Sequence, residues 1–126
     1  METVYILDYD IDIAFVLNEW LQLNGFKTKS FSGLEQLFLN LNAKHPECII
    51  LDCKHGKESL LPEICSTIQK VFNYTGKIIL TSTANISDNQ IQVCNANGFM
   101  AKPFDFVNMV DVLKEQIDKP HQRHMA

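Results

Sequence analysis

The stretch that most constrains the fold is residues 47–54, ECIILDCK, in which three consecutive large aliphatic residues lead directly to Asp52. An apolar run without polar alternation predicts a strand covered on both faces, which is typical of a central strand in a parallel sheet. Asp52 is then expected where the chain leaves the core. Ligands of open α/β sheets bind outside the carboxyl ends of the strands, where the strand order reverses, so Asp52 is a candidate functional carboxylate. A turn-initiating aspartate is the alternative.

The chain has 126 residues, which predicts one domain (residues 1–118) that folds by itself, followed by a polar, flexible tail (residues 119–126). The net charge of −4 provides no basic surface for direct binding of nucleic acid. No apolar stretch approaches the roughly 18 residues of a membrane span, and the strand-like VYIL at residues 4–7 leaves no room for a signal peptide. We therefore expect a cytoplasmic protein that does not contact a membrane.

Four cysteines occur, and no two of them form a C-x-x-C pair. Most of them lie in apolar segments, which favours buried, reduced thiols over disulfides or a metal site. The four are Cys48, Cys53, Cys65 and Cys94.

Five apolar or alternating segments are predicted to be strands, and a segment with helical periodicity follows each of them. The predicted strands lie at 4–7, 26–31, within 47–54, at 77–81 and at 99–101. The first predicted helix starts at 12 and ends at Asn24-Gly25, and the second runs from 32 to 41. The third begins near Pro62 and has Ile64, Ile68 and Val71 or Phe72 on one face. The fourth runs from Ser87 to Asn97-Gly98, and the fifth runs from 105 to 117. Capping boxes are expected at Ser32 with Glu35 and at Ser87 with Gln90.

Alternating strands and helices indicate an α/β fold, a doubly wound parallel sheet with right-handed crossovers. The first, third and fourth strands are wholly apolar and are expected in the centre, whereas the second carries two lysines and suits an edge. The order 2-1-3-4-5, the flavodoxin-like arrangement, satisfies burial best.

This order brings the ends of the first and third strands together, so Asp8, Asp10 and Asp52 are expected to converge. Neighbouring carboxylates repel one another unless a cation lies between them, and hard oxygen ligands favour Mg²⁺. The hydroxyl cluster at residues 81–83 and Lys102 follow the other two strands. Such a site suits a phosphoryl group; a set of polar residues without a ligand is the alternative interpretation.

On these residues the chain resembles the receiver domain of two-component response regulators, over about residues 3–118. The resemblance is carried by ILDYD at 6–10, IILD at 49–52, IILTS at 78–82 and NGFMAKPFD at 97–105. The last is the most specific, because Lys-Pro-Phe is the family's usual ending of the fifth strand. The resemblance implies phosphorylation of Asp52 by a histidine kinase or a phosphotransfer protein.

The resemblance also implies roles for other residues. Lys102 matches the family's lysine, Thr81 the switch hydroxyl and Phe99 the aromatic residue that reorients on activation. Mg²⁺ would be held by Asp8, Asp52 and the backbone carbonyl of Lys54. The face formed by the fourth helix, the fifth strand and the fifth helix would dock to a downstream protein. We further expect a cis peptide bond between Lys102 and Pro103.

Three departures from the family's pattern bear on these roles. Tyr9 stands where the family has a second acidic metal ligand, so weak Mg²⁺ binding is expected unless Asp10 turns inward. The loop after Asp52 places the cation of Lys54 at the mouth of the site. The segment between the last two strands is short, which leaves open whether Thr81 or Ser82 is the switch hydroxyl.

The first functional hypothesis is a signalling domain switched by phosphorylation, not an independent enzyme. The second is a pseudo-receiver, a protein-binding module that phosphate does not regulate, which Tyr9 favours. A flavin enzyme is disfavoured because the segment after the first strand is acidic. A hydrolase is disfavoured because no histidine lies at a strand end to act as a general base.

Overall fold

The computed structural model describes residues 2–53, 60–84 and 86–120. Its centre is a parallel sheet of five strands in the order β2-β1-β3-β4-β5, which confirms the predicted order. The strands are β1 (Thr3–Leu7), β2 (Lys27–Phe31), β3 (Cys48–Asp52), β4 (Lys77–Ser82) and β5 (Gly98–Ala101). Because all five run in the same direction, their carboxyl ends share one edge of the molecule.

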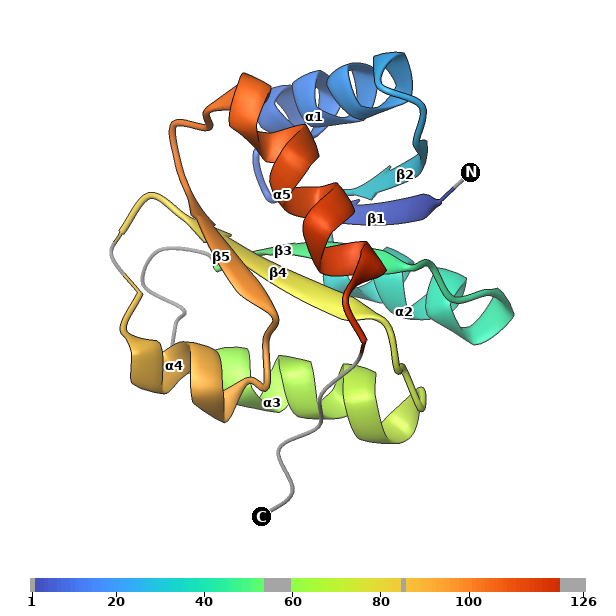
Figure 1. Cartoon of the computed structure of the whole chain (residues 1–126). Helices are drawn as coiled ribbons and strands as arrows, with labels where there is room; N and C mark the ends of the chain where they lie inside the picture. The colour runs from blue at the N-terminus through green and yellow to red at the C-terminus, as the bar shows by residue number, and fades with distance from the viewer. Residues whose placement is uncertain (1, 54–59, 85, 121–126) are drawn as a thin grey trace.

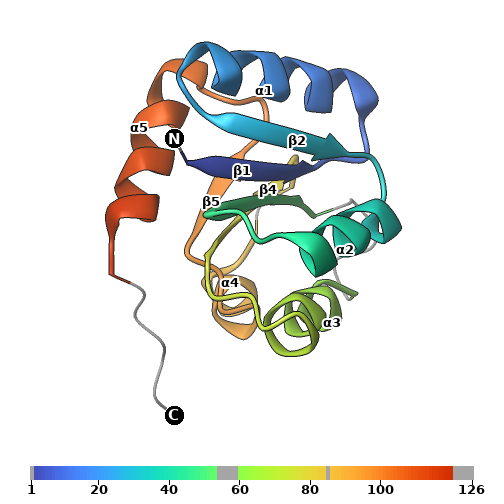
Figure 2. The same ribbon diagram turned by 90° about the vertical axis from the view of Figure 1, so that its right-hand side faces the viewer.

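Helices cover both faces of the sheet, as Figures 1 and 2 show: α1 and α5 lie on one face, and α2, α3 and α4 on the other. The helices are α1 (Ile11–Leu23), α2 (Leu34–Ala43), α3 (Leu61–Ser66), which continues into a π-helical segment η2 (Thr67–Val71), α4 (Asp88–Val93) and α5 (Phe106–Asp118). The flavodoxin-like architecture expected from the sequence is therefore present.

Two hydrophobic clusters, one on each face of the sheet, form the core. Successive strand residues point to opposite faces, so Ile79 of β4 joins the cluster beneath α1 and α5, whereas Ile78 and Leu80 join the cluster beneath α2, α3 and α4. We call these the α1/α5 cluster and the α2/α3/α4 cluster. The apolar runs of β1, β3 and β4 are buried on both sides, which explains why these strands lack polar alternation.

Local sequence signals account for several helix ends. The Asp10 side chain accepts hydrogen bonds from the backbone N–H groups of residues 12 and 13 and so caps α1. Gly25, with φ of 91°, makes the left-handed turn after that helix. Ser87 and Gln90 form the predicted capping box of α4, and the side chain of Asp105 caps α5.

Two predicted helix boundaries are wrong. The capping box at Ser32 is absent because α2 starts one residue later: Gly33 is the N-cap, and no side chain bonds there. Helix α4 ends at Val93 rather than at Asn97-Gly98, since Asn95 adopts the left-handed conformation with φ of 52°. The backbone N–H and side-chain oxygen of Asn97 instead bond to Ile78, so this asparagine extends the sheet pairing.

The apolar face predicted for the third helix is only partly correct. Its buried residues are Leu61, Cys65 and Ile68, whereas Val71 is 71% exposed. Ile64 and Phe72 also pack against the α2/α3/α4 cluster, so of the two residues predicted for the end of this face Phe72 is confirmed and Val71 is wrong.

No helix among the described residues is long and apolar enough to cross a membrane. Helix α5 ends at Asp118, and the predicted tail lies mostly at residues 121–126, outside the described residues.

Candidate phosphoryl-acceptor site

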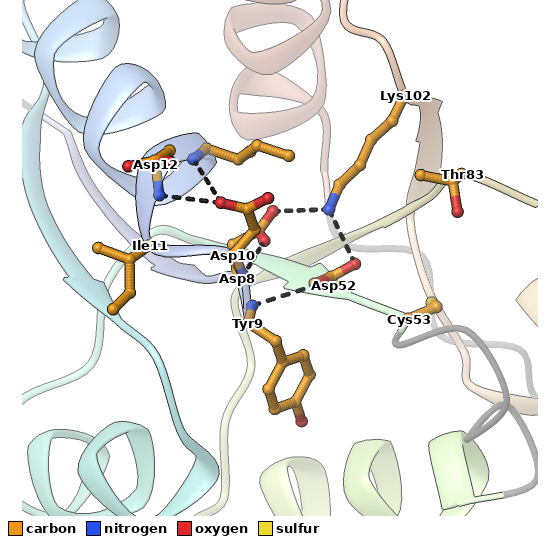
Figure 3. Close-up of a pocket in the computed structure, with 10 residues that line it drawn as sticks. Asp8, Tyr9, Asp10, Ile11, Asp12, Asp52, Cys53, Thr83 and Lys102 are labelled. Carbon is orange, nitrogen blue, oxygen red and sulfur yellow. Dashed lines mark hydrogen bonds and ion pairs between the residues drawn. The ribbon is translucent and has the colours of Figure 1, made fainter.

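Three charged side chains meet where the strand order reverses. Asp8 directly follows β1, Asp52 ends β3, and Lys102 directly follows β5. The register sets Leu7 beside Leu51 and Asp52 beside a β4 residue, so the carboxyl ends of β1, β3 and β4 are level. Figure 3 shows the two carboxylates facing each other, with the Lys102 ammonium reaching down between them.

The ammonium of Lys102 bridges both carboxylates. Its Nζ lies 2.8 Å from Asp8 Oδ2 and 3.1 Å from Asp52 Oδ1. Side-chain exposure is 8% for Lys102, 1% for Asp8 and 9% for Asp52, so solvent screens these ion pairs only weakly. One cation therefore stabilises two acids that would otherwise repel each other.

Backbone groups hold the other oxygen of each carboxylate. The Asp10 N–H donates to Asp8 Oδ1 at 2.9 Å, and the Tyr9 N–H donates to Asp52 Oδ2 at 3.3 Å. Each carboxylate oxygen of this pair thus has a hydrogen-bond donor or an ion-pair partner, and the loop that follows β1 orients both side chains.

Burial and charge shift the acid–base properties of the site. Burial, reinforced by the negative charge of Asp8, raises the pKa of Asp52, although Lys102 and the Tyr9 N–H act in the opposite direction. Burial disfavours the charged Lys102 ammonium, but its hydrogen bonds to both carboxylates and their charges outweigh this effect and raise the pKa of Lys102. Asp52 is consequently more basic than an ordinary aspartate.

Asp10 does not join this ion-pair network. Its exposed carboxylate caps α1, with Oδ1 2.9 Å from the backbone nitrogen of Asp12. Among the described residues there is no group of three or more His, Cys, Asp and Glu side chains arranged to hold a metal ion. Asp8 and Asp52 supply hard oxygen donors that suit Mg²⁺, and the predicted carbonyl ligand, Lys54, lies outside the described residues.

Tyr9 contributes its backbone rather than an anionic side chain. In Figure 3 its ring points away from the two carboxylates, and it packs against the α2/α3/α4 cluster. Burial, followed by the charges of Asp52 and Cys53, raises the pKa of Tyr9, so the phenol is neutral. The two carboxylates of the site can therefore hold a divalent cation, but the side chain at position 9 supplies no third carboxylate.

The three hydroxyl residues at the end of β4 lie in different environments. Thr81 is 1% exposed, and its Oγ1 has no hydrogen-bond partner among the described residues. Ser82 is equally buried, and its Oγ accepts from the Ala84 N–H at 3.0 Å. Thr83 is exposed and lines the pocket, a role that sequence reasoning did not assign, although the residue was part of the predicted hydroxyl cluster.

Phe99 lies apart from the carboxylates. It pairs with Leu80 in the β4–β5 register and packs against the α2/α3/α4 cluster. The Lys102–Pro103 peptide bond is cis, as predicted.

An open pocket of about 540 Å³ lies over the ion pairs. Its lining combines the charged residues with the start of α1: Asp8, Tyr9, Asp10, Ile11, Asp12, Ile13, Asp52, Cys53, Thr83 and Lys102. An acidic pocket with one buried ammonium can bind a cation and a small anionic group at the same time. A purely acidic pocket would repel the anion, and a purely basic pocket would repel the cation.

The parallel sheet with strand order 2-1-3-4-5 defines a flavodoxin-like domain. Its charged site of two carboxylates and a lysine lies at the strand ends, where the strand order reverses. Within this class, the family model of the response regulator receiver domain matches residues 4–114. The chain belongs to this family, and it is a receiver-type signalling domain. None of the curated proteins compared with the chain matches it significantly.

Solved structures show the same fold. A response regulator from Thermotoga maritima superposes with a TM-score of 0.80 at 19% identity, covering 94% of this chain and 99% of its own. TrrA from the same organism, solved in complex with Mg²⁺-BeF, gives 0.77 at 24% identity, covering 92% and 99%. The chemotaxis protein CheY4 of Vibrio cholerae gives 0.77 at 17% identity, covering 92% and 98%.

Proposed function

We propose that the protein accepts a phosphoryl group on Asp52 from a histidine kinase or a phosphotransfer protein and thereby changes a protein-docking surface. The observation that carries this proposal is the position of Asp52 at the sheet's switch point, 3.1 Å from the ammonium of Lys102 and beneath an open pocket. Membership of the receiver family supports the same function.

In the transfer step, an Asp52 oxygen attacks the phosphorus of the donor, and a new O–P bond forms. The P–N bond of a phosphohistidine breaks, and the imidazole nitrogen keeps the electron pair and takes up a proton. Burial makes the Asp52 carboxylate more basic, which favours nucleophilic attack. Lys102 already touches Asp52, so its positive charge is in place to stabilise the phosphoryl oxygens.

A divalent cation, when bound, would supply further positive charge to the phosphoryl oxygens. Asp8 and Asp52 would hold Mg²⁺, with the Lys54 carbonyl implied by the family resemblance. We expect weak binding because the Tyr9 side chain offers no anionic oxygen, and because Lys102 already stabilises the same two carboxylates. The Mg²⁺-BeF complex of TrrA supports the assignment of this cation to the fold.

The alternation of β4 separates the two candidate switch hydroxyls. Thr81 shares the parity of Ile79 and points to the α1/α5 face, whereas Ser82 shares the parity of Leu80. Phe99 lies beside Leu80 on the α2/α3/α4 face. We propose Ser82 as the switch hydroxyl because it shares a face with Phe99. Thr81, which pairs with Asp52 in the β3–β4 register, is the alternative.

Replacement of the two hydroxyls distinguishes these roles. Ser82→Ala should still accept a phosphoryl group but lose the phosphorylation-dependent change in amide hydrogen exchange along β5. Thr81→Val should retain that change and gain about 1 kcal/mol of stability, since it removes a buried hydroxyl without a partner among the described residues. If Thr81→Val abolishes the response while Ser82→Ala keeps it, then Thr81 is the switch hydroxyl.

The docking surface is proposed to be the face formed by α4, β5 and α5. Val93 and Val107 are exposed there, at 57% and 80%, and β5 is an edge strand. Exposed apolar residues on such a face suit a downstream protein partner. The net charge of −4 supports a protein partner rather than nucleic acid.

The test of the proposed function is the intact mass of the protein after incubation with acetyl phosphate and excess Mg²⁺. We expect the mass of one phosphoryl group, which hydroxylamine should remove because an acyl phosphate, unlike a serine or threonine ester, reacts with it. If no adduct forms, the pseudo-receiver hypothesis replaces the present proposal; the position of Tyr9 is the specific observation that favours it.

A further inference from the structure

Three of the four cysteines gather in one hydrophobic cluster, and one of them, Cys53, also lines the pocket over the ion pairs. Cys53 follows β3, Cys65 lies on α3, and Cys94 is the C-cap of α4, and all three belong to the α2/α3/α4 cluster. Cys48 lies apart from them, in the α1/α5 cluster. All four are buried thiols, as the sequence indicated.

Cys65 and Cys94 are buried in the same cluster, and the interaction between their thiols shifts the pKa of each. The side chain of Gln69 in η2 strengthens this junction, because its Nε2 donates to the Cys94 carbonyl at 3.1 Å and to the Asn95 carbonyl at 3.4 Å. Figure 1 shows α4 and α3 side by side. The thiol pair and the Gln69 amide thus join two helices that are separated in sequence by all of β4.

The interaction between the two thiols gives them different properties. The Cys65 thiol lowers the pKa of Cys94, although burial acts in the opposite direction. The Cys94 thiol, together with burial, raises the pKa of Cys65. Cys94 is thus the more readily ionised sulfur, and the thiolate is the form that reacts with oxidants. A neighbouring partner thiol is what a disulfide then requires.

Helix α4 buries less of its surface than its neighbour α3. It spans six residues, none of which is buried, and a capping box holds its first turn. Short helices with few buried contacts open locally at a low free-energy cost. Such an opening would bring Cys94, at the end of α4, to the solvent, while Cys65 stays anchored in α3.

We propose that Cys65 and Cys94 form a reversible disulfide, which ties α3 to α4, when the protein meets hydrogen peroxide. The Cys94 thiolate attacks a peroxide oxygen, the O–O bond breaks, and Cys94 sulfenic acid and water form after proton transfer. The sulfur of Cys65 then attacks the sulfenic sulfur, the S–O bond breaks, and water leaves with the Cys65 proton. In total, two thiols lose two electrons and two protons, and one hydrogen peroxide is reduced to two water molecules.

The disulfide would hold α4 against α3 and so restrain one side of the proposed docking face. Its formation does not depend on phosphorylation of Asp52, which contacts Lys102 and lies outside the α2/α3/α4 cluster. Oxidation and phosphorylation are therefore measured separately, and failure of either leaves the other proposal standing.

The test treats the reduced full chain with hydrogen peroxide, blocks the remaining thiols and measures the intact mass. We expect two blocking groups instead of the four that the reduced chain takes up, a loss of two hydrogen atoms at the other two cysteines and, after proteolysis, a peptide pair that joins Cys65 to Cys94. Because the crosslink closes a loop of roughly 30 residues, the melting temperature should rise by roughly 5–10 °C and return after reduction. Amide exchange in α4 should slow at the same time.

Single substitutions provide the controls. Cys94→Ser and Cys65→Ser should lose both the mass change and the thermal shift, whereas Cys48→Ser, a buried cysteine of the other cluster, should keep them. The wild-type peptide map needs no variant, so a variant that fails to fold does not affect the test. A crosslink to Cys53, oxygen addition without loss of hydrogen, or an unchanged wild-type mass would each overturn the proposal.

Discussion

Asp52→Asn is expected to abolish the mass gain from acetyl phosphate completely, while the protein remains folded. The asparagine has nearly the same shape but no anionic oxygen to attack phosphorus. Asp10→Asn is the matched control, because Asp10 caps α1 and asparagine is an equally good N-cap. That variant should be phosphorylated at the wild-type rate, and the measurement for both is intact mass against time.

The same substitution should make the protein more stable at neutral pH. The pKa of Asp52 is higher in the folded protein than in the unfolded chain, chiefly because of burial and the charge of Asp8. The folded state then holds its proton more tightly, so the stability associated with this group is fully present below the unfolded value of about 3.8 and is lost as pH rises through the folded pKa. Asparagine is permanently neutral and avoids that loss.

Chemical denaturation of wild type and Asp52→Asn as a function of pH measures this effect. The variant should unfold at higher denaturant concentration at pH 7, and the difference should shrink as pH falls toward 4. A variant that is phosphorylated, or one less stable than the wild type at pH 7, would contradict the assignment of Asp52 as a buried acceptor whose charge is only partly compensated by Lys102.

Tyr9→Asp is expected to tighten Mg²⁺ binding by on the order of tenfold and to speed phosphorylation of Asp52. Mg²⁺ relies on one or two carboxylates to fix its geometry, and among the described residues Asp8 and Asp52 are the carboxylates that meet in this site. The backbone of Tyr9 already contacts Asp52, so a short acidic side chain at this position would start beside the site. Titration calorimetry and mass against time measure the two effects.

Tyr9→Phe is the control for Tyr9→Asp, since it keeps the ring in the α2/α3/α4 cluster and adds no charge. Its Mg²⁺ affinity and phosphorylation rate should equal those of the wild type. Tyr9→Asp removes a packed ring, so a loss of about 1–3 kcal/mol of stability is expected beside the gain in affinity. Unchanged affinity and rate in Tyr9→Asp would mean that a side chain at this position does not face the metal.

The strand order and the central charged residues were predictable because they depend on local pattern. Continuous apolar runs identify β1, β3 and β4 as buried strands, and in a parallel sheet their ends must meet. Asp8, Asp52 and Lys102 each follow or end a strand directly, so their convergence needed only the order 2-1-3-4-5. The capping signal of Ser87 and Gln90 was equally local.

Other features were decided by tertiary structure, because the same residue had two ways to satisfy its polar or apolar groups. The carboxylate of Asp10 caps α1 instead of turning toward Asp8. Thr81 and Ser82 are neighbours in a hydroxyl-rich segment, and only the pairing of β4 with β5 decides which of them shares a face with Phe99. The spacing of Cys65 and Cys94 in the sequence does not predict that they lie together, because the pair forms where two helices pack on one face of the sheet. Such long-range packing, unlike the periodicity of a strand, is not encoded by neighbouring residues.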